Sequence, residues 1–89
     1  MKHWNITVFG RVQGVSFRYY TRLKAKEYGL SGFVMNMPEG SVYIEAEGSE
    51  NQLNSLLKWC DDGPILAKVT DTRVEESKVI GFRDFEIKR

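Results

Sequence analysis

The sequence has little of several features that specialised protein classes require. Its single cysteine, Cys60, excludes an internal disulfide and any metal site built from paired cysteines. No apolar run approaches the roughly 20 residues that a membrane span requires, and residues 1–7 turn polar too soon for a signal peptide. We therefore expect a cytoplasmic protein with no membrane partner.

Neither sign of charge dominates the chain. Thirteen Lys and Arg residues oppose twelve Asp and Glu residues, which gives a formal net charge of +1. Such a balance lacks the basic field that non-specific binding to nucleic acid requires, so we expect no nucleic-acid partner. A chain of 89 residues, 42% of them hydrophobic, suits one globular core. We expect a single domain over residues 1–89 and a monomer.

The hydrophobic pattern predicts alternating strands and helices. Strands are expected at residues 4–8, 33–37, 42–47 and within 65–74, with a last short strand through Phe82, Phe85 and Ile87. Apolar residues recur at helical spacing from Phe17 to Tyr28, and Gly29 follows as a left-handed C-terminal cap.

A second helix is predicted to begin after Ser49, because Gln52 stands three residues later as in a capping box. Leu53, Leu56, Leu57 and Cys60 would form its apolar face. The expected fold is α+β, a ferredoxin-like β-α-β-β-α-β sandwich. In it an antiparallel sheet carries two helices on one face, plus a short extra C-terminal strand.

Residues 10–18 form a glycine-containing loop between the first strand and the first helix. Successive backbone N–H groups of such a loop turn inward as an anion-binding nest, and the helix dipole adds partial positive charge. Arg18 stands at the helix start, where its guanidinium could contact two oxygens of one phosphate. On the glycine pattern alone, an ordinary tight turn with a solvent-facing arginine is an equal alternative.

Other phosphate-handling loops are excluded by spacing. Gly10 and Gly14 are separated by three residues and followed by Val15-Ser16, which does not match a Walker A loop. Val12 occupies the position six residues before Arg18 where a cysteine phosphatase has its nucleophile. His3 is the only histidine, so no Ser-His or Cys-His pair is available and direct attack by water is the simpler route.

Four blocks of the sequence together resemble the acylphosphatase family: GRVQGVSFR at residues 10–18, GLSGFVMNMPEG at 29–40, DDGPILAKV at 61–69 and FRDFEI at 82–87. The resemblance covers nearly the whole chain, with the blocks in the family's order. The one departure is Pro38-Glu39-Gly40, where relatives more often have Asp or Asn before the glycine.

The resemblance implies hydrolysis of the carboxyl-phosphate bond of small acyl phosphates to carboxylate and inorganic phosphate, without metal, cofactor or phosphoenzyme. Arg18 would bind the phosphate and Asn36 would hold the attacking water. The remaining implied binding residues supply backbone amides that cradle the phosphate oxygens: Val12, Gln13, Gly14, Val15, Ser16 and Phe17. Without the resemblance, Asn36 would be interpreted as a cap of the following hairpin.

The residues disfavour several alternative functions. An RNA-recognition module shares the element order, but residues 41–47 hold one aromatic residue and two acids rather than a basic-aromatic consensus. A copper chaperone would need a C-x-x-C motif. A non-catalytic phosphate- or anion-sensing module is the remaining alternative. A related domain also opens large hydrogenase-maturation carbamoyltransferases, but a chain ending at Arg89 fits a free-standing enzyme better.

Three polar residues are expected to face solvent. His3 precedes the first predicted strand and has no partner in the sequence pattern. Glu45 and Glu47 share one side of their strand, which is typical of a solvated sheet face.

Overall fold

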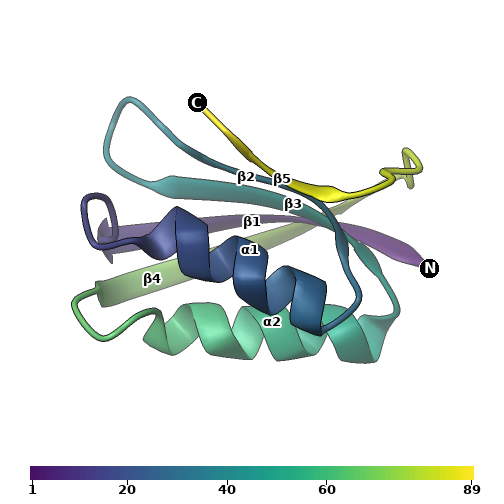
Figure 1. Ribbon diagram of the computed structural model, residues 1–89, viewed down its shortest axis with the longest axis horizontal. Coiled ribbons are helices and arrows are strands. Elements are labelled where there is room, and N and C mark those ends of the chain that lie inside the picture. Colours follow the sequence, from purple (N-terminus) through teal and green to yellow (C-terminus); the bar gives the residue numbers. More distant parts are fainter.

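Five strands form one sheet in the computed structural model, which describes residues 1–89 (Figure 1). The elements are β1 (Lys2–Arg11), α1 (Phe17–Glu27), β2 (Ser31–Asn36), β3 (Val42–Gly48), α2 (Glu50–Asp62), β4 (Lys68–Ser77) and β5 (Phe85–Lys88). The strand order is β4-β1-β3-β2-β5, and both helices lie on one face of the sheet (Figure 1). The predicted ferredoxin-like sandwich with an extra C-terminal strand is confirmed.

The extra strand β5 differs from the others in direction. The pairs β1–β3, β1–β4 and β2–β3 are antiparallel, whereas β5 runs parallel to β2, from Gly32 opposite Phe85 to Met35 opposite Lys88. The prediction that this strand includes Phe82 is wrong, because the backbone amide of Phe82 donates to the Glu47 carboxylate instead of a neighbouring strand.

The helix boundaries follow the predicted signals. Ser49 accepts from the Gln52 amide and the Gln52 side chain accepts from the Ser49 amide, so the capping box of α2 is confirmed. Gly29 follows α1 with φ of +74°, the left-handed conformation expected there. Neither helix has the length and hydropathy to cross a membrane.

The main core lies between the sheet and the two helices. The sheet contributes Ile6 and Val8 of β1 and Ile44 of β3, all fully buried. The helices contribute their predicted apolar faces: Phe17, Thr21 and Ala25 of α1, and Leu53, Leu56 and Cys60 of α2. Burial of these faces fixes α1 against the sheet, and with it the loop that precedes the helix.

The opposite face of the sheet holds a buried ionic cluster. His3 and Glu47 are each 1% exposed, so the expectation that they lie in solvent is wrong. Nδ1 of His3 lies 2.7 Å from Oε2 of Glu47, while the amides of Ile80, Gly81 and Phe82 donate to the same carboxylate. The sequence pattern gave no sign of this burial, because the segment before β5 covers the two side chains.

The cluster changes the acidity of both groups. Burial alone raises the pKa of Glu47, but the hydrogen bonds from His3 and from the three amides outweigh it and lower the pKa from 4.5 to about 2. Burial alone lowers the pKa of His3. Its hydrogen bonds with Glu47, Glu45 and Asn5 outweigh that effect and raise its pKa above 6.5. An ionised pair therefore ties β1, β3 and the segment before β5 together.

Candidate active site

The loop between β1 and α1 has an alternating backbone. Gly14 and Ser16 have φ of +74° and +62°, while the residues on either side of each have negative φ. When positive and negative φ values alternate along a segment, its successive N–H groups turn toward one side. This is the geometry of an anion-binding nest. Ser16 is the only residue other than glycine with positive φ, and it immediately precedes α1. A left-handed serine costs roughly 1–2 kcal/mol, so the surrounding structure must hold it there.

Gly10 shapes the entry to this loop. Its φ is +123°, and the register of β1 against β4 shifts between Phe9 and Gly10 as in a β-bulge. A Cβ atom at this position would overlap the carbonyl oxygen of Lys68. Only glycine therefore allows β1 to stay this close to β4 while it turns toward the loop.

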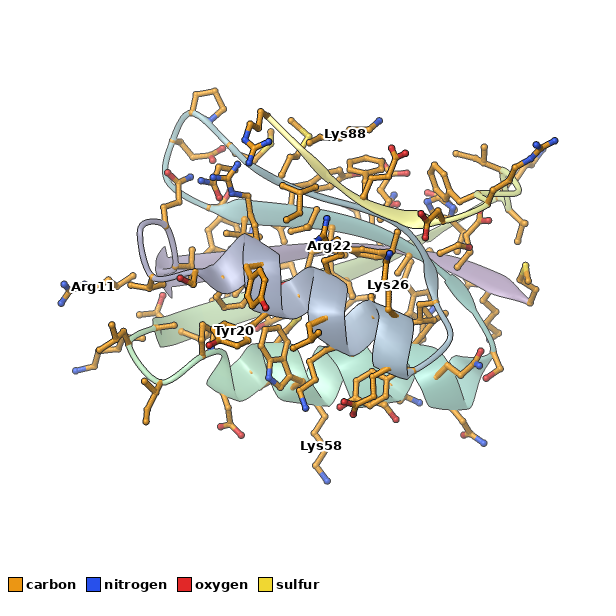
Figure 2. The ribbon with its side chains drawn as sticks, viewed as in Figure 1. Arg11, Tyr20, Arg22, Lys26, Lys58 and Lys88 are labelled. Atoms are coloured by element: carbon orange, nitrogen blue, oxygen red, sulfur yellow. The ribbon has the colours of Figure 1, made fainter.

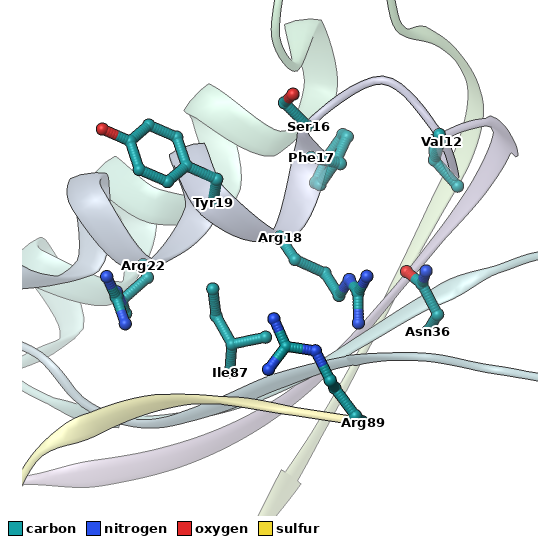
Figure 3. A pocket seen from close by; sticks show the side chains of 10 residues that line it. Val12, Ser16, Phe17, Arg18, Tyr19, Arg22, Asn36, Ile87 and Arg89 are labelled. Atoms are coloured by element: carbon teal, nitrogen blue, oxygen red, sulfur yellow. The ribbon is translucent and has the colours of Figure 1, made fainter.

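A cavity of about 550 Å³ opens beside the loop (Figure 3). It lies among the loop, the start of α1, the end of β2 and the end of β5. Its lining residues are Val12, Gly14, Ser16, Phe17, Arg18, Tyr19, Arg22, Asn36, Ile87 and Arg89. The lining includes three arginines and no aspartate or glutamate, so the cavity is suited to an anion.

Arg18 and Asn36 meet across this cavity. Arg18 is half-buried in the first turn of α1, and its guanidinium points toward the side chain of Asn36 (Figure 3). Asn36 is the last residue of β2. The fold thus brings together two residues that are 18 positions apart, as the resemblance implies.

The side chain of Asn36 has an unsatisfied acceptor. Its Oδ1 atom is buried and accepts no hydrogen bond. The alternative assignment, in which Asn36 caps the hairpin, does not describe this structure, because its side chain makes no bond to the turn. The Glu39 carboxylate accepts from Ser41, and Met37 donates to Ser41, so other groups hold that turn. A buried acceptor without a donor costs about 1–3 kcal/mol, which favours a water or ligand hydrogen bond there.

Two predicted binding residues do not line the cavity. The Gln13 side chain donates to the carbonyl oxygens of Met37 and Ser41, at 2.8 and 2.9 Å. It therefore ties the loop to the β2–β3 hairpin that carries Asn36. Val15 is buried and packs in the core. The other four predicted loop residues, Val12, Gly14, Ser16 and Phe17, line the cavity; contact of the loop amides with phosphate stays a prediction.

Four lining residues were not predicted from the sequence: Tyr19, Arg22, Ile87 and Arg89. Arg22 follows Arg18 by one helical turn, so the helix prediction already placed both on one face. Ile87 and Arg89 could not be found in that way. They reach the cavity only because β5 lies parallel to β2, a pairing that no local pattern specifies.

Other kinds of catalytic group are distant or absent from the described structure. The cavity lining holds no histidine or cysteine. Cys60 is fully buried on the apolar face of α2, within the main core. No three His, Cys, Asp or Glu side chains are grouped to hold a metal ion. The polar side chains that the cavity offers include three guanidinium groups and one carboxamide, beside a loop with the backbone of an anion-binding nest, and such groups neutralise charge and orient water.

Comparison with known proteins gives one consistent result. A family model described as Acylphosphatase matches residues 4–87. A protein of Thermotoga maritima named Acylphosphatase is 52% identical over 88 residues, which cover 99% of this chain and 98% of that protein. A Methylococcus capsulatus protein of the same name is 46% identical over 90 residues, covering 100% and 98%.

Solved structures agree with the sequences. The crystal structure of acylphosphatase from Bacillus subtilis superimposes with a TM-score of 0.97 at 42% identity, covering both chains completely. A full-length HypF structure in its phosphate- and nucleotide-bound form matches with a TM-score of 0.89 at 31% identity. That match covers 99% of this chain but 12% of the HypF chain.

Proposed function

This chain belongs to the acylphosphatase family, and we propose that it hydrolyses the carboxyl-phosphate bond of small acyl phosphates by direct attack of water. The observation that carries the mechanism is the meeting of Arg18 and Asn36 beside a loop whose φ angles alternate in sign. The cytoplasmic location and the monomeric state expected from the sequence stay predictions.

The phosphate would be held by the loop and by Arg18. Backbone N–H groups of the nest and the N-terminal end of α1 would donate to its oxygens, and the guanidinium would bridge two of them. These donors are fixed by the backbone before substrate arrives. They would neutralise the charge on the equatorial oxygens in the transition state, which is the main requirement of phosphoryl transfer.

Asn36 would position the nucleophile. The buried Oδ1 atom has no donor within the protein, so it would accept a hydrogen bond from a water, and a lone pair of that water would then point toward phosphorus. A carboxamide cannot take up the water's proton as a base at neutral pH. That proton would pass to an oxygen of the phosphate group itself.

The chemistry of this cavity fits a good leaving group. Water oxygen bonds to phosphorus, the bridging P–O bond breaks, and its electron pair leaves on the carboxylate oxygen. The conjugate acid of a carboxylate has a pKa of about 4, so the leaving group needs no proton from the protein. A phosphate monoester expels an alkoxide or a phenolate, which is a poorer leaving group than a carboxylate and which this set of residues could not stabilise.

Hydrolysis of acetyl phosphate in the presence of a chelator tests this function directly, with p-nitrophenyl phosphate as the control substrate. We expect chelator-resistant cleavage of acetyl phosphate and no cleavage of the control. Cleavage of neither compound would favour the anion-sensing alternative.

The two residue roles are separable. Arg18→Gln is expected to abolish turnover and to remove binding of inorganic phosphate, whereas Asn36→Ala should reduce kcat by at least about a hundredfold and leave phosphate binding intact. Arg11→Gln and Asn54→Ala, exposed residues outside the cavity, are the matched controls. Phosphate titration by NMR separates binding from turnover. Unchanged hydrolysis in either cavity variant would remove that residue from the mechanism.

A further inference from the structure

The two halves of the candidate active site follow strands that are not neighbours in the sheet. The loop at residues 10–18 connects β1 to α1, whereas Asn36 is the last residue of β2. In the strand order β4-β1-β3-β2-β5, strand β3 separates β1 from β2. The hydrogen-bond ladders of the sheet therefore link the loop to Asn36 only through β3.

The side chain of Asn36 is not fixed by a partner of its own. Its buried Oδ1 atom has no donor within the protein. The place of this atom relative to the loop therefore depends on where the backbone holds the end of β2. A mechanism that needs the phosphate and the water in one line requires that distance to be set by some other contact.

One side chain bridges the two halves directly. Nε2 of Gln13 donates to the carbonyl oxygens of Met37 and Ser41, at 2.8 and 2.9 Å. Met37 follows Asn36 in the chain, and its amide donates to the same Ser41 carbonyl at 2.9 Å. The carboxamide of Gln13 thus spends both of its N–H groups on the two residues that close the hairpin just beyond Asn36.

The neighbouring side chains of the loop do not make such a contact. Arg11 is exposed and extends away from the molecule (Figure 2). Val15 packs in the main core, and the Ser16 side chain makes no hydrogen bond that caps α1. The two bonds from Gln13 are the only side-chain hydrogen bonds that join the loop to the β2–β3 hairpin.

We propose that Gln13 is a positioning residue, whose side chain holds Asn36 at a fixed distance from the loop so that the attacking water meets the phosphate in line. This inference rests on the proposed function for the places of the water and the phosphate. A shift of Asn36 by about 1 Å would be enough to slow the reaction by on the order of a hundredfold. The Gln13 side chain faces the hairpin, so its backbone amide stays free to serve the nest.

Gln13→Met removes both donors, keeps a side chain of similar length and leaves the backbone amide in place. We expect kcat for acetyl phosphate to fall about tenfold to a hundredfold, while KM and the affinity for inorganic phosphate change by less than about threefold. Gln13→Glu, which also lacks both donors at neutral pH, should show the same division and serves if the first variant does not fold. An unchanged kcat in a folded Gln13 variant would overturn the proposal.

Gln52→Met is the matched control. It removes the hydrogen bond that the Gln52 side chain accepts from the Ser49 amide at the start of α2, outside the cavity. This variant should unfold at a lower urea concentration but keep the kcat of the unmodified protein. A loss of kcat as large as that in Gln13→Met would assign the effect to stability and contradict a positioning role.

A combination with Asn36→Ala shows whether Gln13 acts through Asn36. If it does, Gln13→Met should lower kcat by less than about twofold further in the Asn36→Ala protein, because the group that it positions is already gone. A further loss as large as that in the unmodified background would place the effect in the loop itself and refute the proposal.

Vanadate extends the test to a complex that needs no turnover. Vanadate accepts a fifth ligand, so with a bound water it mimics the in-line geometry and needs both the loop and Asn36, whereas phosphate needs the loop alone. Titration calorimetry should show that Gln13→Met weakens vanadate binding about tenfold more than phosphate binding. Equal losses for the two ions would exclude the positioning role. A failure of the unmodified protein to hydrolyse acetyl phosphate, with this selective loss intact, would count against the proposed function alone.

Discussion

Replacing Glu47 with glutamine should test how the buried ionic cluster holds β5 in place. The substitution keeps the side-chain volume but removes the negative charge opposite His3. It also replaces one carboxylate oxygen with an NH₂ group, which cannot accept from the backbone amides. At least one of the donors of Ile80, Gly81 and Phe82 would then lose its acceptor.

The pKa of Glu47 sets the size of the effect. A fall from 4.5 to about 2 corresponds to about 3 kcal/mol, because each pKa unit is worth about 1.4 kcal/mol. Glu47 is 1% exposed, so solvent screens this interaction little. A loss of about 3 kcal/mol is a large part of the roughly 5–15 kcal/mol that stabilises a domain.

The stabilisation depends on pH in a defined direction. The folded-state pKa of Glu47 lies below 4.5, so its contribution is complete above pH 4.5 and is lost as the pH falls toward 2. The folded-state pKa of His3 lies above 6.5, so its contribution is complete below pH 6.5 and is lost as the pH rises through that folded pKa. The pair should therefore stabilise the protein most between about pH 4.5 and 6.5.

Urea unfolding of the unmodified protein and of Glu47→Gln at about pH 6 and about pH 2.5 measures both effects. We expect a difference in free energy of unfolding of about 3 kcal/mol at the higher pH that decreases markedly at the lower pH. Glu75→Gln, on the exposed strand β4, is the matched control and should change little. A difference below about 1 kcal/mol near pH 6, or one that is equal at both pH values, would refute the assigned role of the cluster.

Two further predictions concern the loop entry and the buried thiol. Gly10→Ala should destabilise the fold by about 2 kcal/mol or more, because its Cβ would meet the Lys68 carbonyl; Gly40→Ala, with positive φ but no atom within 4 Å, should cost less. Urea unfolding compares the two variants. Equal losses in free energy of unfolding would show that the close approach of Gly10 to the Lys68 carbonyl is unimportant. Burial raises the pKa of the Cys60 thiol, so a disulfide reagent should label it only as fast as the protein unfolds. Rapid labelling in native buffer would contradict its burial.

Local sequence signals were sufficient for most of the fold. The capping box at Ser49 and Gln52 and the apolar faces of both helices specify α2 and α1 from residues close together in the chain. Arg18 and Asn36 were identified through the family resemblance, and the structure places them together. A local pattern would have left Asn36 as a turn residue, since nothing near it in sequence indicates the cavity.

What the sequence did not predict depends on contacts between distant segments. The burial of His3 and Glu47 results from residues 80–82 lying over that face of the sheet, more than 30 positions away from Glu47. In the same way, Arg89 reaches the cavity through the parallel pairing of β5 with β2. Alternation along a strand indicates which side chains share a face, but not what covers that face.

The order of the strands has a consequence for aggregation. The sheet is open, so β4 and β5 each expose an edge to which a strand of another molecule could hydrogen-bond. The β5 edge is only four residues long. The ten-residue β4 edge presents five exposed charged residues: Lys68, Asp71, Arg73, Glu75 and Glu76. A strand added there would have to desolvate charges of both signs. The longest exposed edge of the sheet is therefore protected against strand pairing between molecules.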